Sequence, residues 1–230
     1  MSDPLISLES VSAGYHGQPV IHDIDLHVDS GSMHALFGAN GSGKTTTLLT
    51  VAGVVRVQSG KILLAGKTHP GSLYLSARRQ RLALLTDDRG IFPPLTVREN
   101  LKLGRGSVGA ALEYFPELTD HVDRPAGQLS GGQQQMLSLA RILASEPSII
   151  LADELSLGLA PLIVRRLMVA LRAAADQGAA VLLVEQHVPI ALQSVDSASV
   201  LSRGRITLRG DAEEFRSDPT KILDQYLTAA

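Results

Sequence analysis

The order of hydrophobic and polar residues predicts two strands near the N-terminus of the chain. Ile24, Leu26 and Val28 alternate with polar residues, and this period of two is typical of a half-buried strand. An earlier strand is expected over 6–11, and turn residues at 12–19 separate the two. Because strands with one polar face are typical of antiparallel sheets, we expect this pair to form an antiparallel layer.

Apolar runs predict a different kind of strand further along the chain. These runs lie at 35–37, 82–85, 149–152 and 181–184, and one more strand is expected at 61–65. Helical patterns alternate with them at 46–55, 137–144 and 162–176. Thr96 and Glu99 have the spacing of a capping box, which indicates a further helix from there through Leu103. Buried strands joined by helices predict an α/β fold with a mainly parallel sheet core, covered on both faces.

One segment interrupts this alternation. Glycine and proline punctuate residues 104–127, which contain a single short helical pattern at 110–115. We therefore expect a small helical subdomain, separate from the sheet core.

Composition places the chain among ordinary globular proteins. The hydrophobic share is 44% and the charged share 19%, which excludes intrinsic disorder. Since no run approaches 18 apolar residues and no basic stretch precedes an apolar core, we expect neither a membrane span nor a secretory signal. Twenty-one Lys and Arg against 23 Asp and Glu give no basic footprint for nucleic acid, and the absence of cysteine excludes thiol chemistry. The expected class is a soluble intracellular protein.

A glycine-rich loop follows the apolar run at 35–37. Gly38-Ala-Asn-Gly-Ser-Gly-Lys44-Thr45 matches the pattern G-x-x-x-x-G-K-[ST]. The glycines let successive backbone N–H groups converge on a triphosphate, and the following helix directs its positive end at the same anion. Lys44 is predicted to reach the β- and γ-phosphates of ATP, and Thr45 to offer its hydroxyl to Mg²⁺.

Two carboxylates follow the apolar run at 149–152. Ligands of open α/β sheets bind at the carboxyl ends of the strands, so Asp153 and Glu154 are expected beside the phosphate loop. Asp153 would hold Mg²⁺, and Glu154 would polarise the attacking water.

A second glycine motif, Leu129-Ser-Gly-Gly-Gln133, opens the helix expected before residue 144. Ser130 can cap that helix, and the helix N-terminus offers a second site for an anion. A simple cap would not require Gly131, Gly132 and Gln133 as well, so the motif is interpreted as a second anion-binding helix start.

Together these motifs resemble those of the ATP-binding cassette (ABC) ATPases, over essentially the whole chain. Gly38–Thr45 resembles Walker A, Leu129–Gln133 the signature motif, and Asp153-Glu154 Walker B with its catalytic glutamate. Tyr15 lies where the family places an aromatic residue that stacks on adenine.

The resemblance implies a P-loop ABC-ATPase fold in a single domain over 1–230. Residues 1–86 and 148–230 would form the catalytic core with its β layer, and about 87–147 a helical subdomain carrying the signature motif. The resemblance also implies that two cassettes close face to face. ATP on the Lys44 loop of one would be covered by Ser130 and Gly132 of the other, and hydrolysis would separate them.

A narrower resemblance is to the shorter of the two ATPases of branched-chain amino acid importers. It rests on Ser156–Pro161, Val184-Glu-Gln186, Thr96–Leu101 and Asp224–Leu227. It implies a peripheral subunit on the cytoplasmic face of the membrane that couples ATP hydrolysis to uptake of branched-chain amino acids or a related small solute. Relatives of that importer carry urea or short amides.

The implied partners are a second ABC ATPase subunit, either a paralogue or a second copy, transmembrane permease subunits and, indirectly, a periplasmic solute-binding protein. Nucleic acid is not an expected partner. Two alternatives remain at this point: a soluble cassette ATPase acting on DNA ends or ribosomes, and a nucleotide-dependent regulatory module with low turnover.

Three positions depart from the family pattern. Asp87 occupies the place of a glutamine that touches Mg²⁺, and Leu155 replaces a proline that often follows the acidic pair. The histidine that contacts the γ-phosphate corresponds either to Gln186, which we favour from the count to the following helix, or to His187 one residue beyond.

The expected cofactors are ATP and Mg²⁺. The residues assigned to catalysis are Glu154, Gln186 and Lys44. Those assigned to Mg²⁺ are Thr45, Asp153 and Asp87. Those assigned to the nucleotide are Tyr15, Gly38, Ala39, Asn40, Gly41, Ser42, Gly43, Lys44, Thr45, Thr46, Ser130, Gly131, Gly132 and Gln133.

Overall fold

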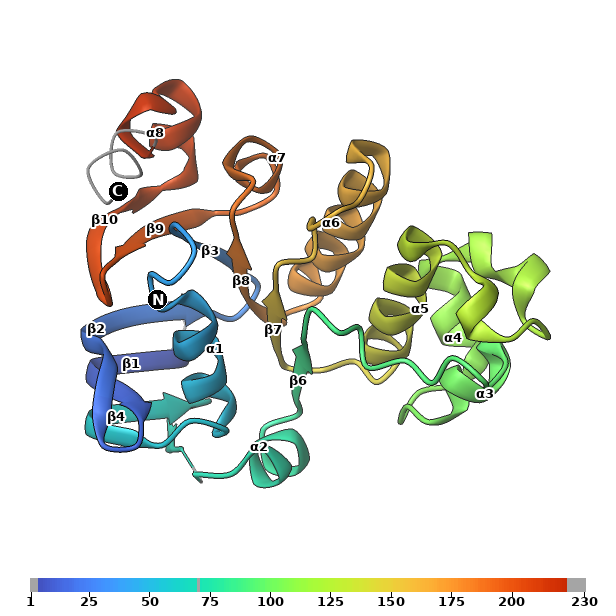
Figure 1. Cartoon of the computed structure of the whole chain (residues 1–230), viewed down its shortest axis with the longest axis horizontal. Coiled ribbons are helices and arrows are strands. Elements are labelled where there is room, and N and C mark those ends of the chain that lie inside the picture. Colours follow the sequence, from blue (N-terminus) through green and yellow to red (C-terminus); the bar gives the residue numbers. More distant parts are fainter. Residues whose placement is uncertain (1–3, 70, 223–230) are drawn as a thin grey trace.

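Two β-sheets and a group of helices make up the computed structural model, which describes residues 4–69 and 71–222 (Figure 1). The first sheet has the order β2-β1-β4-β5 and is antiparallel. Its strands are β1 (Pro4–Tyr15), β2 (Gln18–Asp29), β4 (Val57–Leu64) and β5 (Lys67–Thr68). The expectation of an N-terminal antiparallel layer is confirmed.

The turn expected at 12–19 is wrong, because only His16 and Gly17 separate β1 from β2. Both residues have positive φ, of 53° and 81°, as tight two-residue hairpins require. Strand pairing continues through Gly14 because this glycine has no side chain. A Cβ there would lie 2.0 Å from the carbonyl oxygen of Gln18.

The second sheet has the order β10-β9-β3-β8-β7-β6, and its neighbours are parallel except for the pair β9 and β10. Its strands are β3 (Met33–Phe37), β6 (Leu82–Leu85), β7 (Ile149–Asp153), β8 (Ala180–Glu185), β9 (Ser197–Ser202) and β10 (Arg205–Asp211). The predicted α/β fold with a mainly parallel core is therefore confirmed.

The helices are α1 (Lys44–Ala52), α2 (Leu73–Arg79), α3 (Val97–Lys102), α4 (Val108–Tyr114), α5 (Gly131–Leu143), α6 (Pro161–Asp176), α7 (Val188–Leu192) and α8 (Ala212–Ser217), with 3-10 helices at Pro116–His121 and Ala126–Gln128. The predicted capping box of α3 is confirmed, since the Thr96 side chain accepts from the backbone N–H of Glu99 while Glu99 accepts from that of Thr96. In contrast, α1 begins two residues before the predicted start, directly after Gly43.

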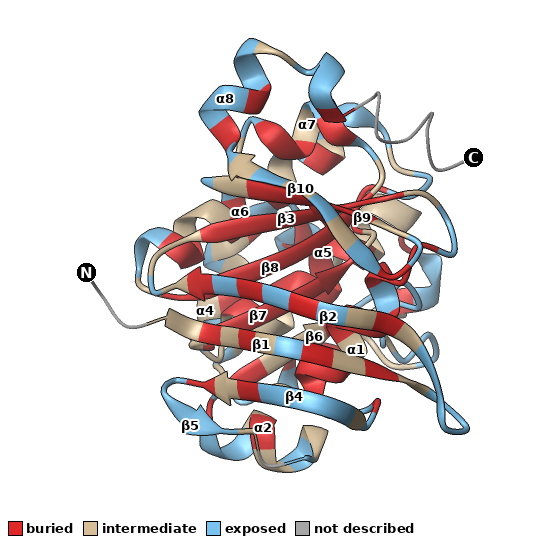
Figure 2. Cartoon of the chain, turned by 90° about the vertical axis from the view of Figure 1, so that its left-hand side faces the viewer, coloured by how far each residue is buried: buried red, intermediate tan, exposed pale blue. Residues whose placement is uncertain are grey.

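The six-stranded sheet separates two hydrophobic clusters. Side chains alternate across β8, so Val181 and Leu183 join the cluster with α6, while Leu182 and Val184 join the cluster under β1, β2 and α1. Figure 2 shows β8 buried along its length and β2 striped between buried and exposed residues. The helices α3, α4 and α5 contact one another at the other end of the molecule from α1 (Figure 1). No helix within the described ranges is long and apolar enough to cross a membrane.

Candidate functional site

The glycine-rich loop lies between β3 and α1, against the hairpin of the antiparallel sheet. Gly41 and Gly43 adopt φ values of +77° and +106°, a conformation that residues with side chains rarely take. A Cβ on Gly43 would lie 2.8 Å from Cγ2 of Ile21, and a Cβ on Gly38 would lie 2.4 Å from the carbonyl oxygen of Leu201. The backbone therefore follows this path only with glycine at both positions.

Lys44 turns back over the loop that precedes it. Its Nζ donates to the carbonyl oxygens of Gly38, at 2.8 Å, and Ala39, at 3.2 Å, and lies 3.6 Å from Oε1 of Glu154. Burial lowers the pKa of the ammonium group, while the charges of Glu154 and Asp153 oppose that change. The loop thus holds a cation between its own carbonyl oxygens and the carboxylate of Glu154.

An unpartnered hydroxyl tests whether the loop fits a phosphate. Oγ of Ser42 is buried and has no hydrogen-bond partner within the described structure. Leaving a buried donor unsatisfied costs about 1–3 kcal/mol, so such a group indicates a missing acceptor. A phosphate oxygen would accept from it, so the loop residues fit an anion. Of the other loop residues, Asn40, Gly41 and Thr45 are exposed and Thr46 is buried in the first turn of α1.

The end of β7 carries a buried carboxylate beside the loop. Oγ1 of Thr45 donates to Oδ1 of Asp153 at 3.3 Å. Burial raises the pKa of Asp153 to about 6; the Thr45 hydrogen bond opposes this rise, and the charges of Glu154 and Asp87 add to it. Asp87, two residues after β6, is exposed.

These residues fit a metal only with further ligands. No group of three or more His, Asp or Glu side chains in the described part of the chain could hold an ion alone. Mg²⁺ is commonly bound by one or two carboxylates together with substrate phosphates, and Thr45 with Asp153 suits that arrangement.

Glu154 follows β7 in a left-handed conformation, with φ of +46°. Its backbone N–H donates to the carbonyl oxygen of Val184 at 2.9 Å, and its Oε1 accepts from Nε2 of Gln186 at 2.5 Å. His187, the alternative to Gln186, is exposed at the start of α7. The structure therefore brings Gln186 to Glu154.

The signature motif lies on α5, away from the phosphate loop. Ser130 caps the helix in a capping box with Gln133, whose Nε2 is also 2.9 Å from Nε2 of His121. A Cβ on Gly131 would first meet the side chain of Arg89, and one on Gly132 that of Ile163. The helix α5 packs on α3, α4 and the 3-10 helix Pro116–His121. Within one chain the signature motif therefore belongs to this group of helices.

Tyr15 ends β1 at the hairpin, and its side chain is 45% exposed. An exposed ring at this position is free to pack against a flat apolar partner.

Two residues at this edge of the sheet were given no separate role by sequence reasoning. Glu185, the last residue of β8, is buried, and its carboxylate accepts from both the backbone N–H and the hydroxyl of Ser156. A lone acidic residue at the end of the apolar run 181–184 was the available signal, but it does not identify Ser156 as its partner.

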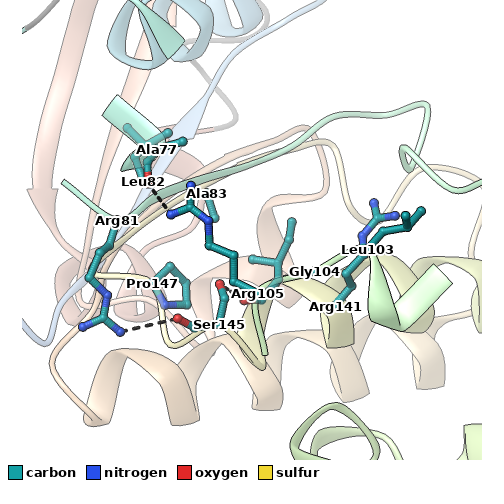
Figure 3. Close-up of a pocket in the computed structure, with 11 residues that line it drawn as sticks. Ala77, Arg81, Leu82, Ala83, Leu103, Gly104, Arg105, Arg141, Ser145 and Pro147 are labelled. Carbon is teal, nitrogen blue, oxygen red and sulfur yellow. Dashed lines mark hydrogen bonds between the residues drawn. The ribbon is translucent and has the colours of Figure 1, made fainter. Parts of the chain in front are cut away.

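A separate hollow of about 280 Å³ lies where α2, β6 and the C-terminal end of α5 meet (Figure 3). Arg81, Arg105 and Arg141 line it, and each guanidinium group donates to a backbone carbonyl oxygen. None of its lining residues belongs to the glycine-rich loop. The hollow is therefore distinct from the candidate phosphate site.

Comparison with known proteins agrees with this geometry. The ABC transporter family model matches residues 21–156. The high-affinity branched-chain amino acid transport ATP-binding protein BraG of Pseudomonas aeruginosa is 36% identical over 97% of this chain and 99% of its own length. The probable branched-chain amino acid transport ATP-binding protein LivF of Archaeoglobus fulgidus is 34% identical over 89% of this chain and 91% of its own.

Solved structures share the fold. A nucleotide-free ATP-binding cassette from an ABC transporter superimposes with a TM-score of 0.83 at 22% identity, covering 96% of this chain and 98% of that one. An ATP-binding subunit of an ABC transporter gives 0.80 at 26% identity, covering 96% and 97%. These matches do not favour the two alternative functions. The chain belongs to the ABC transporter family, and it is an ATP-binding subunit and an ATPase of that family.

Proposed function

We propose that this subunit hydrolyses ATP with Mg²⁺ to drive the import of branched-chain amino acids or a related small solute. The contact between Lys44, Glu154 and Gln186 carries the proposal. Lys44 begins α1 after the glycine-rich loop, and Glu154 and Gln186 directly follow β7 and β8. The three side chains meet at a single carboxylate oxygen, Oε1 of Glu154. The relatives BraG and LivF support the choice of solute.

The residues would share the work as follows. Backbone N–H groups of Gly38–Thr45, the Ser42 hydroxyl and the Lys44 ammonium group would bind the phosphates, with Tyr15 against the adenine. Thr45, Asp153 and Asp87 would hold Mg²⁺, which when bound neutralises charge on the phosphates.

Glu154 would accept a proton from the attacking water at Oε1, while Gln186 orients that carboxylate. Nζ of Lys44 lies 3.6 Å from the same oxygen. Glu154 and Gln186, which follow the neighbouring strands β7 and β8, would thereby fix the direction from which water approaches.

A second chain would complete the site. Ser130 caps α5 in the helical group, where its backbone N–H and hydroxyl bond to Gln133. We infer that Ser130, Gly131, Gly132 and Gln133 cover ATP bound to a second ABC ATPase subunit, which would be a paralogue or another copy.

The remaining partners follow from this arrangement. A permease would rest on the helical subdomain, about 87–147, and connect it to the core formed by 1–86 and 148–230. The chain would then lie peripherally on the cytoplasmic face of the membrane, with a solute-binding protein acting on the far side. The residues Asp224–Leu227, which supported this narrower resemblance, lie outside the described ranges.

Steady-state ATPase measurements on the full chain test the catalytic proposal. Glu154→Gln is expected to lower kcat by about 100-fold or more, because proton transfer by a positioned base contributes about 10²–10⁴-fold. Gln186→Ala is expected to lower kcat, and His187→Ala, its neighbour, to leave kcat unchanged. Equal rates for the wild type and Glu154→Gln would refute the role of Glu154.

Transport measurements test the solute. The chain is co-expressed with its permease subunits, and uptake of labelled leucine is measured with urea and short amides as competitors. Competition by leucine, isoleucine and valine alone supports the proposal. Uptake of urea without leucine would refute the amino acid assignment and leave the ATPase proposal intact.

A further inference from the structure

The loop after β7 is hydrogen-bonded to the end of β8 at four points. The backbone N–H of Glu154 donates to Val184, and Nε2 of Gln186 donates to Glu154. Between these two contacts, Ser156 donates twice to Glu185, from its backbone N–H to Oε1 at 3.0 Å and from its hydroxyl to Oε2 at 2.5 Å. We name this last pair of bonds the Ser156–Glu185 clamp.

Burial makes the clamp costly to open. Glu185 is 1% exposed and Ser156 is 4% exposed. Within the described residues, no Lys, Arg or His side chain forms an ion pair with Glu185, and its carboxylate accepts from Ser156 at both oxygens and from the backbone of Gln186. A buried carboxylate that loses hydrogen bonds is disfavoured. Movement of the loop would remove both bonds from Ser156, and the clamp therefore holds the two segments in one arrangement.

The loop needs such a constraint because Glu154 is strained. Its φ of +46° lies in the left-handed region, which a residue with a side chain adopts only when its surroundings hold it there. A proline at position 155 would disfavour that conformation of the preceding residue, whereas Leu155 is compatible with it. The hydrogen bonds from the loop to β8 therefore hold Glu154 in this conformation.

We propose that Glu185 is a positioning residue, which through Ser156 fixes the conformation of Glu154 and hence the place of its Oε1. The inference rests on the proposed role of Glu154 and adds two residues that act through it. Both oxygens of Glu185 accept hydrogen bonds from Ser156, and the carboxylate acts on the loop through these bonds. Its effect is on the geometry of proton acceptance.

The test uses Ser156→Ala, which removes one bond of the clamp, and Ser156→Thr, which retains the hydroxyl. Glu185→Gln serves as a second variant, because it keeps the size of the side chain and one acceptor oxygen. Ser76→Ala is the matched control, since its hydroxyl is also buried and lies 3.3 Å from Nε2 of His69, on α2 and away from the site. Each is made in the full chain.

Two measurements are made on every variant. The first is kcat and KM for ATP. The second is backbone hydrogen exchange at 154–158 in nucleotide-free protein, which reports the loop without any turnover. We expect Ser156→Ala to lower kcat by about 10–100-fold with KM within about threefold, because small misplacements of reacting groups have effects of this order. Exchange at 154–158 should become at least about tenfold faster.

The variants should differ in a defined way. Ser156→Thr should recover most of kcat and of the exchange protection, Glu185→Gln should resemble Ser156→Ala, and Ser76→Ala should change neither quantity. In a Glu154→Gln background, Ser156→Ala should cause no further loss of kcat, since both changes would act on one carboxylate.

Failure of the clamp and failure of the proposed function are distinguishable. Wild-type kcat and exchange in Ser156→Ala, beside an inactive Glu154→Gln, would overturn the clamp alone. A wild-type rate in Glu154→Gln would overturn the proposed function itself. Additive losses in the double variant would overturn the claim that Ser156 acts through Glu154.

Discussion

Asp153 destabilises the nucleotide-free fold because its carboxylate is held in a buried place suited to a metal. The residue is 5% exposed, and within the described part of the chain its side chain accepts a hydrogen bond from Thr45 at 3.3 Å. Asp153→Asn keeps the shape and an oxygen that accepts from Thr45, but removes the charge. We therefore expect this substitution to stabilise the protein in the absence of Mg²⁺ and ATP, while weakening Mg²⁺-dependent binding.

The pKa of Asp153 gives the magnitude. Burial raises it from an ordinary 3.8 to about 6. At ~1.4 kcal/mol for each pH unit, the charged carboxylate costs the fold about 3 kcal/mol at neutral pH. Because the folded state holds the proton more tightly than the unfolded chain, this cost is absent below pH 3.8, grows from pH 3.8 to 6, and is constant above that.

Urea unfolding in the presence of EDTA measures the effect. The free energy of unfolding of Asp153→Asn should exceed that of the wild type by about 3 kcal/mol at pH 7.5 and by about 1 kcal/mol at pH 4.5. The rise in Tm at pH 7.5 should be about 6–12 °C. Glu113→Gln, at an exposed position on α4, is the control for the loss of one negative charge. No gain at pH 7.5, or an equal gain at both pH values, would refute the reasoning.

Three further predictions concern the loop, the helix cap and a buried imidazole. Gly43→Ala should lower the free energy of unfolding by about 1–3 kcal/mol, because of its positive φ, and should abolish binding of a fluorescent ATP analogue; unchanged binding would contradict the close contact with Ile21. Ser130→Ala should cost about 1 kcal/mol in urea unfolding through loss of the helix cap; an unchanged value would contradict the capping role. Burial lowers the pKa of His34 to about 3, so the neutral form stabilises the fold above pH 6.5 and that stability is lost as the pH falls toward 3. Asp153 has the opposite pH dependence, so the measurement is made in the Asp153→Asn variant. Its free energy of unfolding should fall by about 2 kcal/mol from pH 7.5 to 5. A free energy of unfolding that does not change with pH would contradict the effect of His34.

Hydrophobic runs and residue spacing predicted those strands and helices whose formation depends on residues close together in the sequence. The runs 149–152 and 181–184 are buried at every position, on both faces of the sheet, which requires apolar residues throughout, and the edge strand at 82–85 is buried at Leu82 and Leu85. The helix after Thr96 is set by two side chains three residues apart. Such signals are complete within a few residues of sequence.

Other elements depend on contacts that a linear pattern does not reveal. No strand was predicted after residue 184, yet β9 and β10 extend the sheet, and the serines of β9 at 197 and 199 bond to His34 on β3. The helix α2 was also not predicted. Polar strands and short exposed helices are specified by their partners.

Some residues of the candidate site could likewise be predicted from the sequence, and others could not. The phosphate loop and the acidic pair are contiguous motifs, so their residues could be named from sequence. The Ser156–Glu185 clamp joins positions 29 residues apart and depends on the neighbouring places of β7 and β8. The sequence alone also left Gln186 and His187 as alternatives, because one residue along a loop decides which side chain faces Glu154.

The position of β8 between β3 and β7 constrains how the protein can be made. Both neighbours leave the ribosome before β8 does, and neither can pair with the other while its place is empty. Until residue 185 has been synthesised and released, the edges of β3 and β7 that flank the place of β8 are unpaired, and such edges are prone to aggregation. We therefore expect a truncation before Ala180 to produce a client for chaperones rather than a smaller enzyme.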